Sequence, residues 1–320
     1  MAKLVYLEDV ERIENTVLTV GTFDGVHAGH RVLVNKVISE AKERKARSVI
    51  VTFDPHPREI INPGSSGINL LTTLKERCGL LAEMGIDEMV VIPFDRDFSL
   101  LSSHEFVRDI IWKKIGVSRF IIGYDHQFGK DREGSIGTVK KLGEELGFDA
   151  YIVSKHEVGD KAVSSTKIRN ALEDKGDVEE AAILLERHYL LSGTVVHGNK
   201  QGNKIGFPTA NLLPSHPRKI VPKNGVYAVW VEYQNNYYRA MMNIGTRPTY
   251  KGTNRTIEIH ILDFDRDIYG ESLKIQFVKR IRNEVKFDSV DELKNRLSED
   301  RAITESVLKE NKPDIAILKE

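Results

Sequence analysis

The chain has 320 residues and a mass of 36.2 kDa, which is enough for two domains with separate hydrophobic cores. Its 47 lysine and arginine residues balance its 47 aspartate and glutamate residues, so the charge excludes an extended basic surface for holding nucleic acid. A single cysteine, Cys78, excludes an internal disulfide, and no apolar run approaches the roughly 20 residues of a membrane span. We therefore expect a cytoplasmic protein that binds neither nucleic acid nor membrane.

The first part of the chain alternates short apolar runs with helical patterns. The Val/Ile-rich runs are residues 16–20, 48–53, 88–94 and 120–123. The helical patterns are residues 30–44, 70–85, 137–147 and 164–187. Continuous β-branched runs joined by helices are typical of a parallel sheet that is buried on both faces. We predict a doubly wound, Rossmann-like α/β domain over residues 1–186.

After His188 the apolar residues alternate with polar ones, as expected for antiparallel strands. Residues 225–233 and 237–245 flank Asn235 and Asn236, which predicts a hairpin with an Asn turn. Residues 256–264 and 273–282 alternate in the same way, and no long helix separates these strands. An antiparallel sheet closed into a small barrel fits this pattern, followed by an amphipathic helix at 289–310. The second domain is predicted over residues 187–320.

The first candidate site is the sequence GTFDGVHAGH, residues 21–30, between a strand and a helix. Open α/β sheets bind ligands at such turns, where glycines and unpaired helix N–H groups admit a phosphate. His27 and His30, spaced by one helical turn, would add donors on one side of the helix. Together with Gly21, Phe23 and Asp24, they are our candidates for binding ATP phosphates.

Three other segments bring polar groups to the domain. Asp54 and His56 follow the strand at 48–53, and Asp125 follows the strand at 120–123. The Gly129-Lys130 pair is not a P-loop, because its spacing from Gly123 is wrong and Asp131 stands where Ser or Thr should bind magnesium. The segment SSTKIR, residues 164–169, opens a helix with hydroxyls and two cations. Taken alone, each of these segments is also compatible with an ordinary loop or a capped helix.

In combination, these segments resemble the nucleotidyltransferase superfamily with an HxGH signature. GTFDGVHAGH is similar to that superfamily's G-x-F-D-G-x-H-x-G-H motif, and SSTKIR to its S-S-T-x-I-R motif. The resemblance implies attack of a phosphate nucleophile on the α-phosphorus of ATP, with pyrophosphate leaving. It implies that His27 and His30 stabilise charge on the α-phosphate and that Ser165, Thr166 and Arg169 hold the departing phosphates. We assign Asp54, His56 and Asp125 to binding the acceptor.

The second candidate site lies in HGNKQGNKIGFPTANL, residues 197–212. Gly198, Gly202 and Gly206 are too widely spaced for a dinucleotide fingerprint but suit a loop that contacts phosphates. Thr209 and Asn211 can face one side of an extended chain and bind a hard cation through oxygen, although an isolated PTAN sequence is usually a plain turn. Glu258 lies in an alternating strand, where a carboxylate usually faces solvent. Asp263, Asp265 and Asp267 are not an EF-hand, because Ile268 replaces the required glycine.

The order of these motifs resembles the riboflavin kinase domain from end to end. Joined to the HxGH domain, the chain is similar to the bacterial bifunctional riboflavin kinase/FAD synthetase family over nearly its whole length. That resemblance implies a six-stranded β-barrel kinase, with Thr209 and Asn211 as the Mg²⁺ ligands, the glycine loop on ATP, and Glu258 as the base that deprotonates the ribityl 5′-hydroxyl. It implies two steps, riboflavin plus ATP to FMN and FMN plus ATP to FAD and pyrophosphate, with FMN as the acceptor at Asp54, His56 and Asp125.

Two other functions remain open at this point. A class I aminoacyl-tRNA synthetase shares an HxGH-type turn, but it would need a basic tRNA-binding surface. A flavin-binding regulator would keep the barrel without catalysis, and the presence of Thr209, Asn211 and Glu258 argues against it. Riboflavin, FMN, FAD and ATP are the expected partners, and the sequence does not identify protein partners.

Overall fold

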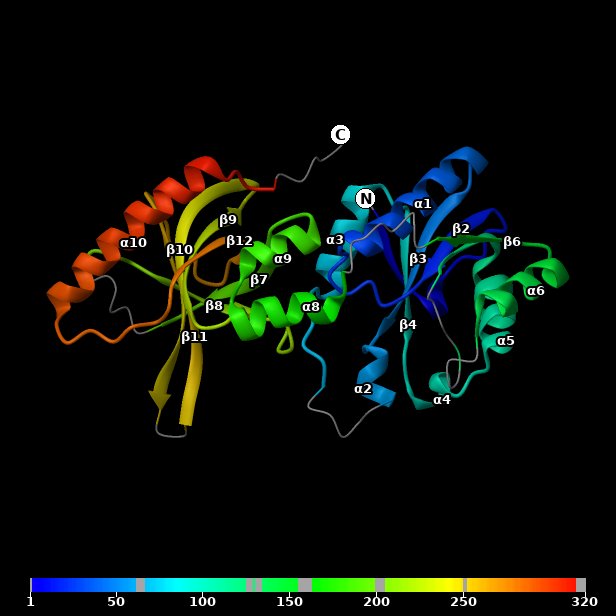
Figure 1. Cartoon of the computed structure of the whole chain (residues 1–320), viewed down its shortest axis with the longest axis horizontal. Helices are drawn as coiled ribbons and strands as arrows, with labels where there is room; N and C mark the ends of the chain where they lie inside the picture. Colours follow the sequence, from blue (N-terminus) through cyan, green and yellow to red (C-terminus); the bar gives the residue numbers. More distant parts are fainter. Residues whose placement is uncertain are drawn as a thin grey trace. The chain divides into compact units, whose positions relative to one another are not determined.

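The computed structural model describes residues 2–61, 67–124, 129, 134–154, 163–198, 205–249 and 252–314. The chain divides into two compact units (Figure 1). The first comprises Met1–Ile68, Leu74–Val163 and Ile317–Glu320, and the second comprises Asn69–Thr73 and Ser164–Ala316. We describe each unit by itself.

The first unit is built on a six-stranded parallel sheet in the order β1-β4-β3-β2-β5-β6. The strands are β1 (Lys3–Tyr6), β2 (Thr16–Val20), β3 (Arg47–Asp54), β4 (Glu88–Pro93), β5 (Val117–Gly123) and β6 (Asp149–Val153). Every residue of β2 is buried, as expected for a central parallel strand covered on both faces. The predicted α/β class and parallel sheet are confirmed. The edge strands β1 and β6 were not among the predicted runs.

Helices pack on both faces of this sheet. The elements of the unit are η1 (Leu7–Asp9), α1 (Ala28–Arg44), α2 (Pro57–Ile61), α3 (Leu74–Met84), α4 (Arg96–Ser99), α5 (Ser103–Glu105), η2 (Phe106–Ile115) and α6 (Ile136–Leu146). Ile50 of β3 lies in one core cluster with residues of α1 and α3, while its neighbours Val49 and Val51 lie in another with residues of η2 and α6. Successive β3 side chains therefore supply opposite cores, which is the doubly wound arrangement.

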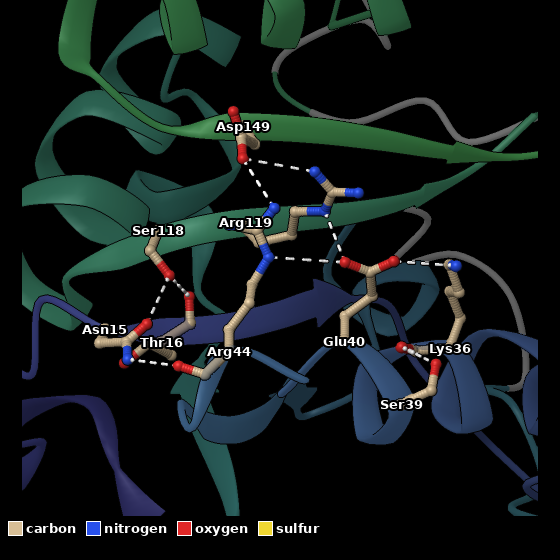
Figure 2. A network of polar contacts seen from close by, with 9 residues as sticks. All are labelled: Asn15, Thr16, Lys36, Ser39, Glu40, Arg44, Ser118, Arg119 and Asp149. Carbon is tan, nitrogen blue, oxygen red and sulfur yellow. Dashed lines mark hydrogen bonds and ion pairs between the residues drawn. The ribbon is translucent and has the colours of Figure 1, made fainter. Parts of the chain in front are cut away.

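A charged network ties α1 to the sheet at the end of α1 opposite its N-terminus (Figure 2). Glu40, buried on α1, forms ion pairs with Arg119 of β5 at 3.0 Å, with Lys36 at 2.9 Å and with Arg44 at 3.5 Å. Arg44 and Arg119 also contact Asp149 at the start of β6. Burial alone would raise the pKa of Glu40, but these cations outweigh it and the pKa is lowered. The network fixes the helix that carries His27 and His30 at its other end.

The predicted helix at 70–85 begins later than expected. Only Leu74–Met84 is helical, and Leu70 instead forms a parallel bridge with Lys219 inside the second unit. The Leu70 N–H donates to the Arg218 carbonyl at 2.7 Å, and the Ile220 N–H donates to the Leu70 carbonyl at 3.0 Å. Strand-like hydrogen bonds to a distant segment therefore replace the first helical turn.

The second unit is a closed barrel in the order β10-β11-β8-β7-β12-β9, which confirms the predicted six-stranded antiparallel barrel. Its strands are β7 (Tyr189–Val196), β8 (Ala210–Pro214), β9 (Gly225–Tyr233), β10 (Asn236–Thr249), β11 (Gly252–Ile261) and β12 (Ser272–Arg282). Along β7, buried and partly exposed residues alternate, so one face supplies the core. The turn between β9 and β10 is Gln234-Asn235, both with positive φ, one residue before the predicted Asn pair, and Asn236 begins β10.

In the described part of the second unit, four helical segments accompany the barrel. These are α8 (Ser165–Asn170), η4 (Ala171–Lys175), α9 (Val178–Leu185) and α10 (Val290–Glu310). Helix α10 packs on the barrel wall through Leu308, which lies in one cluster with Trp230 and Val278. Its buried Asp300 accepts hydrogen bonds from Arg282 of β12, the closest at 2.7 Å. Because residues 164–186 fall in this unit, the functional boundary at 186/187 stays a prediction.

Candidate active sites

The turn at residues 21–30 lies at the topological switch point of the first unit. Strand β2 pairs with β3 on one side and β5 on the other, so the chain reverses direction across the sheet at β2. Ligands of open α/β sheets bind at the carboxyl ends of strands at such a point. Gly21 continues directly from that end of β2, and its N–H donates to the Val51 carbonyl of β3 at 3.0 Å. The sequence-based location of the site is therefore consistent with the fold.

The backbone of this turn is strained. Phe23 and Val26 have φ values of +46° and +41°, and Gly25 has +89°. A β-branched residue with positive φ is costly and persists only where the surroundings enforce it, most often at functional sites. A Cβ atom on Gly21 would lie 3.0 Å from the Phe23 ring, so the buried ring packs tightly against this glycine.

His27 is the N-cap of α1. Its Nδ1 accepts a long hydrogen bond of 3.4 Å from the His30 N–H, and the two rings stack with centroids 3.6 Å apart. An Nδ1 atom that accepts a hydrogen bond carries no proton, so the proton of the neutral ring lies on Nε2. The cap thus leaves His27 with a donor at Nε2, beside the positive end of the helix dipole.

His30 is held in its neutral form. Burial is the first cause that lowers its pKa well below 6.5, followed by the nearby charges of His27 and Arg77. Its Nδ1 is enclosed and has no hydrogen-bond partner among the described residues. Its ring also contacts Phe23, with centroids 5.0 Å apart. A neutral imidazole at a helix N-terminus can donate a hydrogen bond to an anion and gain a proton as negative charge develops.

Arg77 of α3 contacts the candidate turn, and the sequence analysis did not single it out. Its guanidinium lies 3.7 Å from the carboxylate of Asp24 and donates to Thr52 Oγ1 at 2.9 Å. Both Asp24 and Arg77 are buried. Thr52 in turn donates to the Thr22 carbonyl at 3.0 Å. The chain of contacts shows that Asp24 is held inside the turn by a cation, which fixes the backbone next to His27.

Two of the predicted acceptor residues, Asp54 and His56, follow the carboxyl end of β3 at the same edge of the sheet. Asp54 is the last residue of β3, three positions beyond Val51, and its carbonyl accepts from the Phe94 N–H at 2.9 Å. His56 Nδ1 accepts from the Arg58 N–H at 3.2 Å. Asp125 lies outside the described residues, although Gly123 ends β5 at this edge. Adjacent parallel strands bring their carboxyl ends together, so Asp54 and the turn at Gly21 share this edge.

The SSTKIR segment belongs to the second unit. Ser164 caps α8, and its Oγ accepts from the Lys167 N–H at 3.2 Å. Ser165 and Thr166 form the first turn of α8. Arg169 is buried, and its Nε donates to the Asn69 carbonyl at 2.7 Å. The predicted helix start is confirmed, and its proposed role toward ATP stays a prediction.

In the barrel, three polar residues form a row across neighbouring strands. Glu258 of β11 lies directly opposite Asn211 of β8 and directly opposite Asn243 of β10. Side chains at paired positions point to the same face, with Cβ atoms about 4.5–5.5 Å apart. The structure therefore brings together two of the predicted residues, Glu258 and Asn211, and adds Asn243, which the sequence did not single out. Thr209 lies immediately before β8, two positions from Asn211.

The glycine loop begins against Asn211. A Cβ atom at Gly198 would overlap the Asn211 amide nitrogen and lie 2.6 Å from its Cγ. Gly206 has a φ of +82°, a conformation that favours glycine. Gly202 lies outside the described residues.

These side chains fit a magnesium ion that is bound mostly by its substrate. Among the described residues, no cluster of three or more His, Cys, Asp or Glu side chains is arranged to hold a metal ion. Mg²⁺ in kinases is usually held by one or two protein ligands, together with phosphate oxygens and water. The neutral oxygens of Thr209 and Asn211 beside one carboxylate match that donor set.

Comparisons with known proteins cover both units. The family model of FAD synthetase matches residues 9–167, and that of riboflavin kinase matches residues 185–308. The chain is 39% identical over 288 residues to the bifunctional riboflavin kinase/FMN adenylyltransferase of Escherichia coli strain K12, covering 90% of this chain and 91% of that protein. It is 34% identical to the protein of the same name from Bacillus subtilis strain 168 over 296 residues, covering 91% and 92%.

A solved structure shares the fold of most of the chain. A crystal structure described as a macrolide-efflux protein from Streptococcus pneumoniae superposes with a TM-score of 0.85 at 33% identity, covering 94% of this chain and 98% of that one.

In the part of our chain that the structure describes, none of the helices combines the length and the apolar character that a membrane crossing requires.

Proposed function

The chain belongs to the bifunctional riboflavin kinase/FMN adenylyltransferase family, and we propose that its two polar sites carry these two activities separately. It is a bifunctional enzyme with an N-terminal FAD synthetase domain and a C-terminal riboflavin kinase domain. We place the division of activities at residues 1–186 and 187–320. Riboflavin and ATP are the substrates of the barrel, and FMN and ATP are those of the α/β domain.

In the kinase reaction, Glu258 acts as the general base toward the ribityl 5′-hydroxyl of riboflavin. The observation that supports this role is its position on the strand directly opposite Asn211. A base must lie within hydrogen-bond reach of the hydroxyl whose proton it accepts, and that hydroxyl must face the γ-phosphate. The position of Glu258 on the strand next to Asn211 supports this role, because paired side chains point to the same face of the sheet.

Thr209 and Asn211 would hold Mg²⁺ through their side-chain oxygens, and the loop from Gly198 to Gly206 would contact the ATP phosphates. Bound Mg²⁺ neutralises negative charge on the transferring phosphoryl group. The contact between Gly198 and the Asn211 amide supports this assignment, because a residue with no side chain lets the loop backbone reach the ligand.

In the adenylyl transfer, His27 and His30 donate hydrogen bonds to the α-phosphate of ATP at the N-terminus of α1. The phosphate of FMN attacks the α-phosphorus, and pyrophosphate leaves. Gly21, Phe23 and Asp24 shape the turn, Asp54, His56 and Asp125 bind FMN, and Ser165, Thr166 and Arg169 bind the leaving phosphates. The stacking of His27 on His30, together with the lowered pKa of His30, supports this role, because a neutral imidazole can respond to charge that develops in the transition state.

Both reactions consume ATP, and with a single cysteine the chain has no need of an oxidising compartment, which supports the cytoplasm as its location. The decisive experiment incubates the purified chain with riboflavin, ATP and Mg²⁺ and follows FMN and FAD by chromatography. We expect FMN to form and then convert to FAD, with neither product formed when EDTA is added. Binding of riboflavin without turnover of ATP would instead favour a flavin-binding regulator.

A further inference from the structure

His260 shares a face of β11 with Glu258 and contacts the segment that leads into β8. It lies two positions after Glu258, so the two side chains leave the strand on the same side. Its Nδ1 lies 2.7 Å from the Pro208 carbonyl, and its ring packs edge to face on Phe207 with centroids 5.2 Å apart. With 6% of its surface exposed, this ring is enclosed, unlike an ordinary polar residue on a strand.

The hydrogen bond between His260 and Pro208 lies just beyond the last paired residues of β8 and β11. Glu258 pairs with Asn211 and Ile259 pairs with Ala210, which is the first residue of β8. The next residue in this register would be Thr209, which lies beyond the end of the strand. The His260 ring instead reaches the carbonyl one residue further, on Pro208. Thr209 is thus flanked by the β8 pairing on one side and by this hydrogen bond on the other.

The chemistry of Pro208 fixes which group donates in this hydrogen bond: the His260 ring donates and the Pro208 carbonyl accepts. Proline has no backbone N–H, so its carbonyl is the polar group by which the segment can be held at that residue. A carbonyl only accepts hydrogen bonds, and therefore the proton of the neutral His260 ring must lie on Nδ1. A side chain that donates from another position cannot replace it.

We propose that His260 is a positioning residue of the kinase site, which holds Pro208 so that Thr209 and Asn211 keep their place opposite Glu258. It touches neither substrate nor metal in this role. The inference rests on the proposed function, because it requires Thr209 and Asn211 to bind Mg²⁺ and ATP. Its consequence is that loss of the Nδ1 donor weakens binding of Mg-ATP more than it slows the chemical step.

The test compares three variants of the full chain. The amide nitrogen of His260→Asn falls near the position of Nδ1, that of His260→Gln falls near Nε2, and His260→Leu has no donor. We expect His260→Gln and His260→Leu to raise the KM for Mg-ATP and the Mg²⁺ requirement of the kinase roughly tenfold, the effect of one lost hydrogen bond. His260→Asn should stay within about threefold of the unchanged enzyme, because it keeps the donor. Adenylylation of added FMN by the same samples reports whether the chain is intact.

Two results would overturn the proposal. One is a normal KM for Mg-ATP in both His260→Gln and His260→Leu, and the other is equal impairment of His260→Asn and His260→Gln. A lower melting temperature with an unchanged KM would assign His260 a role in stability only.

Glu258→Gln, measured in parallel, separates this inference from the proposed function. If Glu258→Gln keeps full kinase activity, the site assignment itself fails; if it loses activity while the His260 variants are normal, only the role of His260 fails.

Discussion

The side-chain amide of Asn211 occupies the space that a side chain at Gly198 would need. This contact joins the start of the glycine loop to β8, the strand that carries the proposed metal ligand Asn211. Any larger residue at position 198 therefore requires the Asn211 side chain to move. Strands β7 and β8 pair up to Val196 and Asn211, so the backbone on both sides of this contact is hydrogen-bonded and the Asn211 side chain is the group that must move.

We therefore expect Gly198→Ala to displace the Asn211 amide and to lower kinase activity by at least about tenfold, the equivalent of roughly 1.4 kcal/mol in binding. FMN adenylylation in the same chain should be unchanged. Gly79→Ala serves as the control, because a Cβ atom at Gly79 in α3 meets nothing within 4 Å. Full kinase activity in Gly198→Ala would show that the loop and Asn211 do not act together.

Replacing the proposed base gives a second prediction. Glu258→Gln preserves the size of the side chain but cannot accept a proton, so riboflavin phosphorylation should fall by roughly 10²–10⁴, the usual contribution of a general base. The KM for riboflavin should change little. A kinase rate that is the same in Glu258→Gln and in the unchanged enzyme would remove Glu258 from this role.

The sequence predicted these residues because their motifs lie on short, contiguous stretches. The run TVLTV is β2 without change, and the alternation of β11 is visible in the sequence. Strand β8 and its pairing of Asn211 with Glu258 were not predicted, because that short strand has no such alternation and its partner is distant in the sequence. Arg77 was missed because a charged residue on an amphipathic helix usually faces solvent, whereas here Asp24 and Thr52, distant in sequence, enclose it. The part played by His260 was missed for a similar reason, since its partner carbonyl is on Pro208. The roles of Arg77 and His260 both depend on partners that are distant in the sequence, and a local sequence pattern does not indicate such partners.

The adenylyltransferase site can be tested without disturbing α1. His27 both caps this helix and offers its Nε2 donor, so His27→Ala would remove two functions at once. His27→Asn keeps an oxygen that can cap the helix but has no donor in place of Nε2. We expect His27→Asn to remain folded, to lose FMN adenylylation by at least about 10²-fold and to phosphorylate riboflavin normally. Equal loss of both activities in a folded His27→Asn chain would contradict two separate sites.

The network around Glu40 predicts a stability effect without a change in chemistry. Glu40→Gln leaves Arg119, Lys36 and Arg44 without their shared anion (Figure 2). Breaking a buried ion pair costs about 3–5 kcal/mol, and we expect the lower end because Lys36 and Arg44 are partly exposed to solvent. Thermal unfolding followed by circular dichroism should show a lower transition temperature for the first unit. The exposed Glu43 on the same helix provides the control, Glu43→Gln, which should unfold like the unchanged protein.

The lowered pKa of His30 leads to a prediction about pH. Burial, the His27 ring and the Arg77 charge all disfavour the protonated ring, so His30 stays neutral in the folded protein at pH 6.5, where an unfolded chain is half protonated. The unfolded state therefore binds more protons below this pH, and His30 lowers stability as the pH falls through 6.5 toward its folded pKa. If ATP binds to the neutral form of His30, kcat/KM for FMN adenylylation should hold at pH 6.5 and decline only at lower pH. Arg77→Met removes one of the causes and should move this decline to higher pH, whereas Arg77→Lys should not. An NMR titration of the His30 ring in both variants measures the shift directly, and an equal pKa in Arg77→Met and Arg77→Lys would exclude the influence of this cation.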